Sequence, residues 1–529
     1  MEIEGRNVIG FDYSSGTGLI FQGVNPTLNS LIPEQFYIAS QEDVDSALIK
    51  AKEAFIDFSK TSLEERALFL EAIAHEIEVL GDVLINKINE ETGLSIERIK
   101  NERTRTIFQL HMFAEHVRSG NWLEATIDTE LPNRKPTPKP DIRKMMFPLG
   151  PVVVFGASNF PLAYSVAGGD TASAFAAGCT VIVKAHPAHP GTSALVGHAI
   201  CTAAKKSNMP NGVFSLLFDN GFVVGKALVE HSYTAAVGFT GSLGGGRALF
   251  DLAAKRTTPI PVFAEMGSTN PVVLLPEALK IRANDIAINY AASITLEVGQ
   301  FCTNPGLLLA VGSKHLEQFK KHLIDVFKHV NPGIMLHKGI AEAFVQKSNS
   351  VLSGSEVNLL VESDNKSISG QGRPIIATVK GAEFIINPTL HQEVFGPFSL
   401  LVECESVDEL YSCVKSLHGQ LTGTLIGEPL DFEEHREIVD LLQQKVGRVI
   451  FNGVPTGVEV CPSMTHGGTY PATTDSRFTA VGVHSIKRFL RPVSFQNAPS
   501  NILPEALKDN NPLNLLRLIN GKYSTLNIK

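Results

Sequence analysis

Residues 151–184 have the sequence PVVVFGASNFPLAYSVAGGDTASAFAAGCTVIVK. Two short apolar runs, at 151–155 and 180–184, flank an alanine-rich segment that ends at Gly178. Continuous runs of Val, Ile and Phe separated by helical segments are typical of parallel strands buried on both faces. The alternation continues with apolar runs at 213–218, 235–239 and 261–264. The stretch therefore predicts an α/β fold built on a parallel sheet with helices on both sides.

The rest of the chain repeats this pattern and places helices before it. A second block, from about residue 270 to 460, contains apolar runs at 307–311, 424–426 and 449–451. Nearer the N-terminus, Ser40 and Ser62 open predicted helices in the manner of capping boxes, and Gly81 is expected to end the second of them. Because 529 residues exceed a single ordinary core, two large domains are expected.

Composition limits the class of protein. Lys and Arg number 46 against 54 Asp and Glu, a net charge of −8, and a general nucleic-acid role would need a clustered basic surface instead. No apolar stretch approaches the roughly 18 residues that span a bilayer, and residues 1–4 lack the features of a signal peptide. The six cysteines are scattered without C-x-x-C spacing, which indicates neither a zinc cage nor a redox pair. We expect a cytoplasmic protein without a membrane or nucleic-acid partner.

Cys302 lies on a predicted turn between a helix expected at 285–298 and the apolar run at 307–311. Gly and Pro residues bound this turn, so the side chain can face a cleft rather than a core. A thiol becomes a strong nucleophile only when it is ionised, which requires a helix N-terminus, a cation or a neighbouring base. Most free cysteines are instead small buried hydrophobic residues. The local sequence alone leaves both interpretations open.

Polar and glycine-rich segments follow several predicted strands. Ligands of parallel α/β sheets bind where strands end and helices begin, so these segments are candidate binding sites. Five of them occur in order along the chain: Gly156-Ala157-Ser158-Asn159-Phe160-Pro161, Lys184, Gly238-Phe239-Thr240-Gly241-Ser242, Glu265-Met266-Gly267, and, in the second block, Glu393-Val394-Phe395-Gly396-Pro397.

These segments, with Gly299-Gln300-Phe301-Cys302, resemble the ordered motifs of the aldehyde dehydrogenase superfamily from about residue 20 to 495. The resemblance implies two parallel-sheet α/β domains and a small β oligomerisation arm. The domains it implies are dinucleotide-binding (1–131 and 149–270) and catalytic (271–465), with an arm at 132–148 and 466–500 and a C-terminal tail at 501–529 to which no function is assigned.

The arm contains a proline-rich stretch at 132–140, which suits neither a helix nor an inner strand. We expect it to be extended and to lead into an edge strand at 142–147. The segment 483–493 resembles a second oligomerisation strand of the family. The resemblance therefore implies a homodimer or homotetramer, in which one subunit's arm extends a neighbour's sheet.

The resemblance also implies a catalytic mechanism for a small aldehyde substrate. Cys302, as a thiolate, would attack the carbonyl to give a thiohemiacetal oxyanion. The Asn159 side chain and the Cys302 backbone N–H would donate to that oxyanion. Hydride loss would leave a thioester, and Glu265 would act as the general base that activates water to release the acid.

Cofactor contacts are implied in the same way. Lys184 would bind the adenosine ribose, Ser242 at a helix start would meet the pyrophosphate, and Glu393 would hold the nicotinamide ribose beside Phe395. The remaining candidate cofactor-binding residues are Phe155, Gly156, Pro187, Phe239, Gly241 and Gly246.

The choice between NAD and NADP depends on position 187. Family members that prefer NAD usually carry a glutamate three residues after the lysine, and this chain has Pro187 there. A 2′-phosphate would then meet no like charge, so NADP is the expected cofactor, with NAD also used. Four side chains are candidate donors to that phosphate: His186, His189, Thr192 and Lys226. The pair His186 and His189 lacks a third ligand, so no metal site is assigned.

Two stretches, 184–193 and 455–468, resemble the α-ketoglutarate semialdehyde (2,5-dioxopentanoate) dehydrogenases of sugar-acid and hydroxyproline breakdown. A related branch oxidises long-chain fatty aldehydes with NADP, and it is the alternative. The acidic substrate would need a cation at the tunnel mouth, for which Arg103 and the nearby Arg105 are candidates, although a solvated helix face explains them equally well. Phe160 and Cys461 are further candidate substrate-binding residues.

Two rival functions share most of these features. A CoA-acylating relative would pass the thioester to CoA, but such enzymes generally lack a base at the position of Glu265. A non-catalytic dinucleotide-binding family member would usually have lost the cysteine or the glutamate, and both are present. The sequence therefore favours hydrolysis to the free acid.

Overall fold

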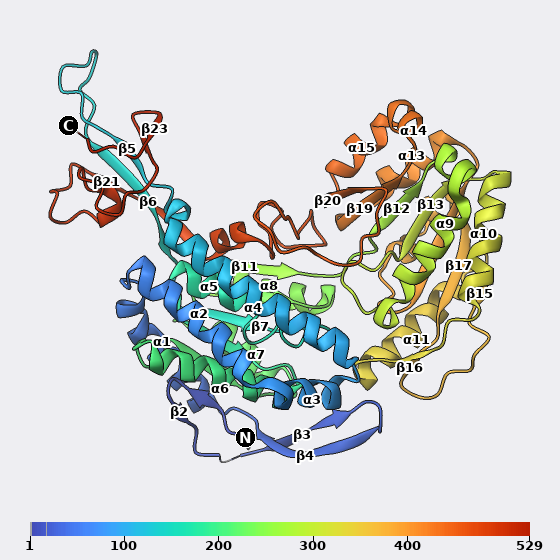
Figure 1. Ribbon diagram of the computed structural model, residues 1–529, viewed down its shortest axis with the longest axis horizontal. Helices are drawn as coiled ribbons and strands as arrows, with labels where there is room; N and C mark the ends of the chain where they lie inside the picture. Colours follow the sequence, from blue (N-terminus) through green and yellow to red (C-terminus); the bar gives the residue numbers. More distant parts are fainter. Residues whose placement is uncertain (1–2, 17, 529) are drawn as a thin grey trace.

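The computed structural model describes residues 3–16 and 18–528, and its first sheet is the parallel sheet that the sequence predicts (Figure 1). Met1 and Glu2, part of the segment examined for a leader, lie outside the described residues. Five adjacent strands run parallel, and two short strands add antiparallel at one edge. The order across the sheet is β11 (Val262–Glu265), β10 (Ala236–Thr240), β7 (Val152–Phe155), β8 (Val181–Lys184), β9 (Phe214–Leu217), β1 (Val8–Ile9) and β2 (Asp12–Tyr13).

Helices cover both faces of this first sheet. Val152 and Val154 pack on one face, whereas Val153 packs on the other, as the pleat of a strand requires. The first face is covered by α2 (Leu63–Val79), α4 (Ile96–Ser119), α5 (Gly169–Ala177) and α6 (Pro190–Lys206), with α3 (Gly81–Thr92) beside them. The second face is covered by α1 (Gln41–Phe58), α7 (Val223–Glu230) and α8 (Leu243–Lys255).

The second sheet lies in a separate lobe of the molecule, at the right of Figure 1. All its neighbours are parallel except β15, which pairs antiparallel at one edge. Its order is β15 (Asn358–Glu362), β17 (Ile375–Lys380), β18 (Phe398–Cys404), β13 (Leu307–Val311), β12 (Pro271–Leu274), β19 (Gln420–Ile426) and β20 (Val446–Phe451). One face packs on α9 (Pro276–Thr295) and α10 (Lys314–Phe327), and the other on α11 (Lys338–Leu352), α12 (Gly381–Ile386), α13 (Val407–Ser416) and α15 (Arg436–Gln443), with α14 (Pro429–Glu434) next to α9.

A five-stranded sheet forms an arm that projects from the first lobe (Figure 1). Its order is β21 (Leu490–Gln496), β6 (Ile142–Pro148), β5 (Thr126–Asp128), β22 (Arg517–Ile519) and β23 (Lys522–Ser524). A hairpin of β3 (Ile20–Asn25) and β4 (Ser30–Tyr37) lies against α3 and α6.

The arm corrects two expectations. The strand predicted at 142–147 is not an edge strand, because β6 pairs with β21 on one side and β5 on the other. Residues 501–529 were expected to form a separate tail, yet β22 and β23 complete the arm's sheet. Arg517 is fully buried there and donates to the carbonyl groups of Lys508 and Leu526. The polar sequence of this segment did not indicate that it belongs to the arm. Arg517 is held by hydrogen bonds to backbone carbonyl groups rather than by apolar contacts.

Residues 466–474, called here the bridging segment, connect the two large sheets. Thr473 forms a β-bridge with Glu265 of β11, the edge strand of the first sheet. Gly468 forms a second bridge with Val446 of β20, the edge strand of the second sheet. The bridging segment thus holds the facing edges of the two sheets in a fixed relation.

Candidate active site

Cys302 lies on a tight turn that follows α9. Residues 297–299 all have positive φ, which turns the chain sharply. A Cβ at Gly299 would lie 2.3 Å from the Gly396 carbonyl oxygen, so only glycine fits this close approach. The Asn270 amide then donates to the Cys302 carbonyl at 2.9 Å. The backbone around the thiol is therefore fixed, as the sequence prediction of a turn requires.

The helix before this turn differs from the prediction. The sequence predicts a helix that starts at Asp285, and α9 starts at Pro276 but is interrupted by non-helical φ and ψ at Arg282. The part after the interruption begins close to the predicted start, and the part before it was not predicted. The Asp431 carboxylate accepts from the backbone N–H groups of Glu277 and Ala278, both at 3.0 Å, and so satisfies the helix start. Because that cap comes from a residue remote in the sequence, the local pattern could not reveal it.

Three reactive side chains form one cluster: those of Cys302, Glu265 and His466. Glu265 ends β11, and His466 begins the bridging segment. The imidazole Nε2 lies 3.4 Å from Cys302 Sγ and 2.8 Å from Glu265 Oε1. Glu265 and His466 are buried while Cys302 is partly exposed, and among the described residues Glu265 Oε2 has no hydrogen-bond partner. The geometry places a nucleophile, a carboxylate and a proton acceptor in one cluster.

The surroundings keep the Cys302 thiol protonated. Burial first, and then the neighbouring Glu265 carboxylate, raise the pKa of the Cys302 thiol well above its usual range, while Arg105 acts in the opposite direction. A thiol in this state is a weak nucleophile until its proton is removed. The imidazole Nε2 of His466 lies within hydrogen-bond distance of Sγ and is placed to accept that proton.

Asn159 lies beside the same turn. Its side-chain amide donates to the Gln300 carbonyl at 3.1 Å. The Cys302 backbone N–H has no acceptor among residues 3–16 and 18–528. Free donors aimed at a developing negative charge are what an oxyanion requires. The structure therefore brings together the three residues predicted to be catalytic, although the Asn159 amide must leave Gln300 to meet a substrate oxygen.

The N-terminus of α8 lies at the carboxyl end of the first sheet. The Ser242 hydroxyl accepts from the Gly245 backbone N–H at 3.2 Å and caps the helix, and residues 241–244 are exposed. Unpaired N–H groups and the helix dipole make such an end suitable for a phosphate anion. Phe155 and Phe239, whose ring centroids lie 6.4 Å apart, end the adjacent strands β7 and β10. This end of the sheet fits a dinucleotide.

Two of the glycines predicted to bind cofactor also lie where no side chain would fit. A Cβ at Gly246 would lie 2.6 Å from Met266 Sδ, because Gly246 is buried between α8 and the sheet. A Cβ at Gly156 would lie 2.7 Å from Ser165 Oγ. The missing side chain of Gly246 lets α8 approach the sheet, and its contact with the cofactor stays a prediction. Gly241, in contrast, is exposed at the helix start.

Lys184 ends β8 and donates to the Asp219 carbonyl at 2.9 Å. Burial lowers the pKa of the Lys184 ammonium to about 8. Pro187 follows on a turn, and its neighbours Gly191 and Thr192 at the start of α6 donate to the buried Glu91 carboxylate.

Two of the four candidate phosphate donors are already engaged. The Thr192 hydroxyl donates to Glu91 at 2.7 Å, and the buried His189 ring binds the Ala157 carbonyl at 3.0 Å. Thr192 and His189 are therefore not free donors. His186 and Lys226 remain, with His186 only half-buried and Lys226 exposed.

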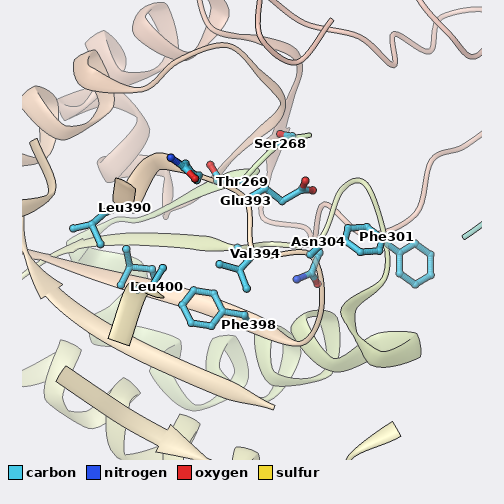
Figure 2. Close-up of a pocket in the computed structure, with 13 residues that line it drawn as sticks. Ser268, Thr269, Phe301, Asn304, Leu390, Glu393, Val394, Phe398 and Leu400 are labelled. Atoms are coloured by element: carbon cyan, nitrogen blue, oxygen red, sulfur yellow. The ribbon is translucent and has the colours of Figure 1, made fainter. Parts of the chain in front are cut away.

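Glu393 and Phe395 line a small pocket formed by residues between Ser268 and Leu400, shown in Figure 2 with Ser268, Phe301 and other residues. Burial raises the pKa of the Glu393 carboxyl to about 7, and the Lys347 ammonium acts against the shift. A Cβ at Gly267 would lie 2.5 Å from Glu393 Oε2. The Glu393 side chain thus packs against Gly267, two residues after the end of β11.

An aromatic wall borders the thiol on its other side. Phe160 and Phe301 meet edge to face with ring centroids 5.6 Å apart, and the Arg98 guanidinium lies over both rings. Phe160 also packs against Tyr164, whose hydroxyl accepts from Arg105 at 3.2 Å. An aldehyde that reached Cys302 would pass this wall.

The two arginines predicted as candidate substrate anchors lie in different surroundings. Arg103 donates to the Gly81 carbonyl at the start of α3, whereas Arg105 interacts electrostatically with Cys302. Two residues on a helix differ by about 200° in direction, so only one of them can face the thiol. Cys461 contacts the Ser463 hydroxyl at 3.7 Å and, among the described residues, makes no hydrogen bond to the Cys302 cluster.

Sequence reasoning missed His466, Tyr164 and Arg448. Arg448 of β20 also interacts electrostatically with Cys302 and donates to the Pro455 carbonyl at 2.8 Å. A charged residue inside an otherwise apolar strand was a usable signal for Arg448. His466 lies in a glycine-bounded loop, where the sequence offers nothing to distinguish a catalytic histidine from a structural one.

Two parallel-sheet lobes, a nucleophilic thiol between them and a phosphate-ready helix end define a thiol-dependent oxidoreductase of the dinucleotide-using class. The chain belongs to the aldehyde dehydrogenase family, whose profile matches residues 14–491. Members of this family oxidise aldehydes with NAD or NADP. The predicted fold class and enzyme class are thereby confirmed.

Individual relatives agree with the family assignment. The chain is 47% identical over 523 residues to alpha-ketoglutaric semialdehyde dehydrogenase 2 of Azospirillum brasilense, covering 99% of this chain and 100% of that protein. It is 44% identical over 504 residues to the alpha-ketoglutaric semialdehyde dehydrogenase of Acinetobacter baylyi, covering 94% and 95%. The structure of betaine aldehyde dehydrogenase from Staphylococcus aureus in complex with NAD+ has the same fold, with a TM-score of 0.80 at 18% identity over 94% of this chain and 96% of that one. No helix among the described residues is long and apolar enough to cross a membrane.

Proposed function

We propose that the protein oxidises α-ketoglutarate semialdehyde (2,5-dioxopentanoate) to 2-oxoglutarate. The observation that carries the proposal is the Cys302 cluster together with two guanidinium groups that interact electrostatically with the thiol, Arg105 of α4 and Arg448 of β20. A substrate with a carboxylate at the far end from its aldehyde would satisfy these cations. The similarity to two semialdehyde dehydrogenases over nearly the whole chain supports the same substrate.

The first chemical step is attack by Cys302. His466 accepts the thiol proton, and the sulfur then forms a bond to the aldehyde carbon while the carbonyl electron pair moves to oxygen. The Asn159 amide and the Cys302 backbone N–H donate to that oxygen, and each such donor is worth about 2.7–4 kcal/mol of barrier. A nicotinamide cofactor would supply the hydride acceptor at this stage, and Cys302 would then carry the acyl group as a thioester.

Hydrolysis of the thioester needs a base. The free Oε2 of Glu265 is buried and can bind a water molecule that faces the sulfur. Glu265 removes a proton from this water as its oxygen attacks the thioester carbon, and the carbon–sulfur bond breaks to return the thiolate and release the acid. Because a base is present, the free acid rather than an acyl-CoA is the expected product.

For the cofactor we propose NADP, with NAD also used. The residues at the end of the first sheet fit a dinucleotide: Lys184 for the adenosine ribose, the start of α8 for the pyrophosphate, and Glu393 with Phe395 for the nicotinamide end. Pro187 carries no carboxylate to repel a 2′-phosphate, and His186 and Lys226 remain as donors.

The deciding experiment measures kcat/KM with 2,5-dioxopentanoate, succinate semialdehyde, hexanal and decanal, each with NAD and NADP. We expect the highest value for 2,5-dioxopentanoate. The variants Arg105→Met and Arg448→Met should lower kcat/KM for that substrate by about 10- to 100-fold, since a hydrogen bond to a charged group is worth about 1.5–3 kcal/mol. They should leave hexanal nearly unaffected.

Arg103→Met is the matched control, because Arg103 lies on the same helix but bonds to the Gly81 carbonyl. It should behave like the wild type with both substrates. A preference for decanal by orders of magnitude would instead assign the protein to fatty aldehydes, and equal losses for acidic and neutral aldehydes in the Arg105 and Arg448 variants would remove their anchoring role.

A further inference from the structure

The Cys302 cluster contains the three side-chain types that bind zinc best: a thiol, an imidazole and a carboxylate. Their ligand atoms all lie within 4.8 Å of one another. Zn²⁺ and Co²⁺ accept such mixed sulfur, nitrogen and oxygen sets, whereas Mg²⁺ and Ca²⁺ prefer oxygen alone. No sequence motif indicates this cluster, because the three residues are separated by 37 or more positions.

The distances are close to those of a tetrahedral ion. Zinc bond lengths imply about 3.6 Å between a sulfur and a nitrogen ligand and about 3.3 Å between a nitrogen and an oxygen ligand. The observed separations are 3.4 Å for Cys302 Sγ to His466 Nε2 and 2.8 Å for that nitrogen to Glu265 Oε1. A carboxylate shift of about half an ångström would complete the geometry. The fourth position faces the partly exposed side of Cys302 and would hold water.

We propose that Cys302, His466 and Glu265 form an inhibitory site for a borderline-soft divalent cation such as Zn²⁺. Binding forms one bond from the ion to each of Sγ, Nε2 and a Glu265 oxygen. The thiol proton is released to solvent, and His466 takes the tautomer with its proton on Nδ1. The ion occupies the sulfur electron pair that would attack an aldehyde, so the enzyme is blocked reversibly. This effect on activity rests on the proposed role of Cys302.

Charge at the cluster supports the ion. A thiolate and the Glu265 carboxylate carry two negative charges in a mostly buried place, and a divalent cation neutralises both. Glu393, whose carboxyl has a pKa raised to about 7, adds a further partial negative charge near the thiol. Arg105 and Arg448 face the thiol as well and act against cation binding. These opposing charges favour a site that releases its ion to a chelator rather than a permanent structural one.

The test uses Co²⁺ as a spectroscopic probe on the full chain, without substrate. We expect one Co²⁺ per chain, with a near-ultraviolet sulfur-to-cobalt charge-transfer band and visible bands typical of tetrahedral coordination. Zn²⁺ should abolish both, and calorimetry in buffers of different ionisation enthalpy should give about one proton released per ion, since a coordinating thiol loses its proton.

Variants identify the ligands. Cys302→Ser should eliminate the charge-transfer band, and His466→Gln should weaken Co²⁺ binding by at least about 10- to 100-fold, the cost of losing even an outer-shell partner of a metal ligand. Cys461→Ser, at another partly exposed thiol, and His329→Gln, at an exposed histidine, are the controls and should bind Co²⁺ like the wild type.

Two results would overturn the proposal. One is a charge-transfer band that persists in Cys302→Ser, which would put the ion on another thiol. The other is an absent band in a wild-type chain that still oxidises aldehydes. Metal binding is measured by absorbance and heat, independently of enzyme activity. A chain that does not bind the ion would therefore leave the proposed function unaffected. A chain that does not oxidise aldehydes would leave the proposed metal site unaffected.

Discussion

The reactivity of Cys302 depends on its burial and on the charged groups around it. In the absence of ligands, burial and Glu265 raise the pKa of the thiol, so the nucleophile is stored in its protonated form. His466 Nε2 lies 3.4 Å from Cys302 Sγ and 2.8 Å from Glu265 Oε1. With its own proton on Nδ1, the imidazole can accept the thiol proton at Nε2, and the new N–H then donates to Glu265. The carboxylate therefore stabilises the imidazolium as well as serving as a base.

This arrangement predicts how alkylation of Cys302 depends on pH. A thiol whose pKa is raised is mostly protonated at neutral pH, so its reaction with iodoacetamide should accelerate steadily as the pH rises from about 6 to 10. Peptide mass spectrometry at Cys302 measures the rate. His466→Gln should slow the reaction at neutral pH.

Cys302→Ser is the control for labelling of the other five cysteines. A rate that is already constant above about pH 7 would contradict the prediction, because it would mean that the thiol is ionised at neutral pH.

At the scale of elements, two helices, α6 and α8, begin at the cofactor end of the first sheet. They differ in which acceptors their first backbone N–H groups have. The start of α8 is capped only by Ser242 and is exposed, which leaves N–H groups free for an anion. The start of α6 is filled by the buried Glu91 carboxylate, which accepts from two backbone N–H groups and the Thr192 hydroxyl. Only one of the two starts can therefore receive a phosphate.

Removing the Glu91 carboxylate should loosen the start of α6. In Glu91→Ala the Gly191 and Thr192 N–H groups lose their acceptor, at a cost of about 1–3 kcal/mol. Hydrogen exchange followed by mass spectrometry should show residues 190–194 exchanging about 5- to 100-fold faster. Glu97→Ala, an exposed acidic residue in the first turn of α4, should leave that segment unchanged. Unchanged protection in Glu91→Ala would show that the carboxylate does not hold the helix start.

The sequence predicted the elements whose signals are local. The buried strands β7 and β8 and the capping boxes at Ser40 and Ser62 depend on residues within a few positions of each other, and the structure has all of them. The start of α9 was missed because its cap, Asp431, is remote in the sequence.

The residues of the candidate site also divide into those that local sequence motifs indicate and those that they do not. Cys302, Glu265 and Asn159 occur in recognisable motifs, and the structure brings them together. His466 lies in the long loop after β20, where no local sequence pattern indicates a catalytic role. The choice between Arg103 and Arg105 depended on the rotation of α4 about its axis, which the sequence of that helix does not fix.

At the scale of the whole molecule, the arm offers two unpaired edges, β21 and β23, to another chain. Edge strands with free backbone groups are the usual places for one chain to extend another's sheet. On this basis we propose a homodimer or homotetramer. The C-terminal strands are part of this surface, since β22 pairs with β5 and Arg143 donates to the carbonyl of Leu507.

Truncation after Ser500 tests the role of the C-terminal strands. The change removes β22 and β23, exposes the edge of β5 and deprives the Arg143 guanidinium of its Leu507 and Asp509 partners. Light scattering coupled to size exclusion should show that the truncated chain no longer has the mass of the full-length assembly. A chain that keeps both its mass and the exchange protection of residues 126–148 would contradict the prediction.

The bridging segment has a consequence for partly unfolded chains. Its two β-bridges hold β11 and β20, and the same segment carries His466. If the lobes separate, the imidazole leaves the sulfur together with the Glu265 carboxylate. With burial and the Glu265 carboxylate both lost, the pKa of the Cys302 thiol would fall back toward its ordinary value. A damaged or immature chain would therefore expose a thiol that reacts more readily with electrophiles than the folded, ligand-free enzyme does.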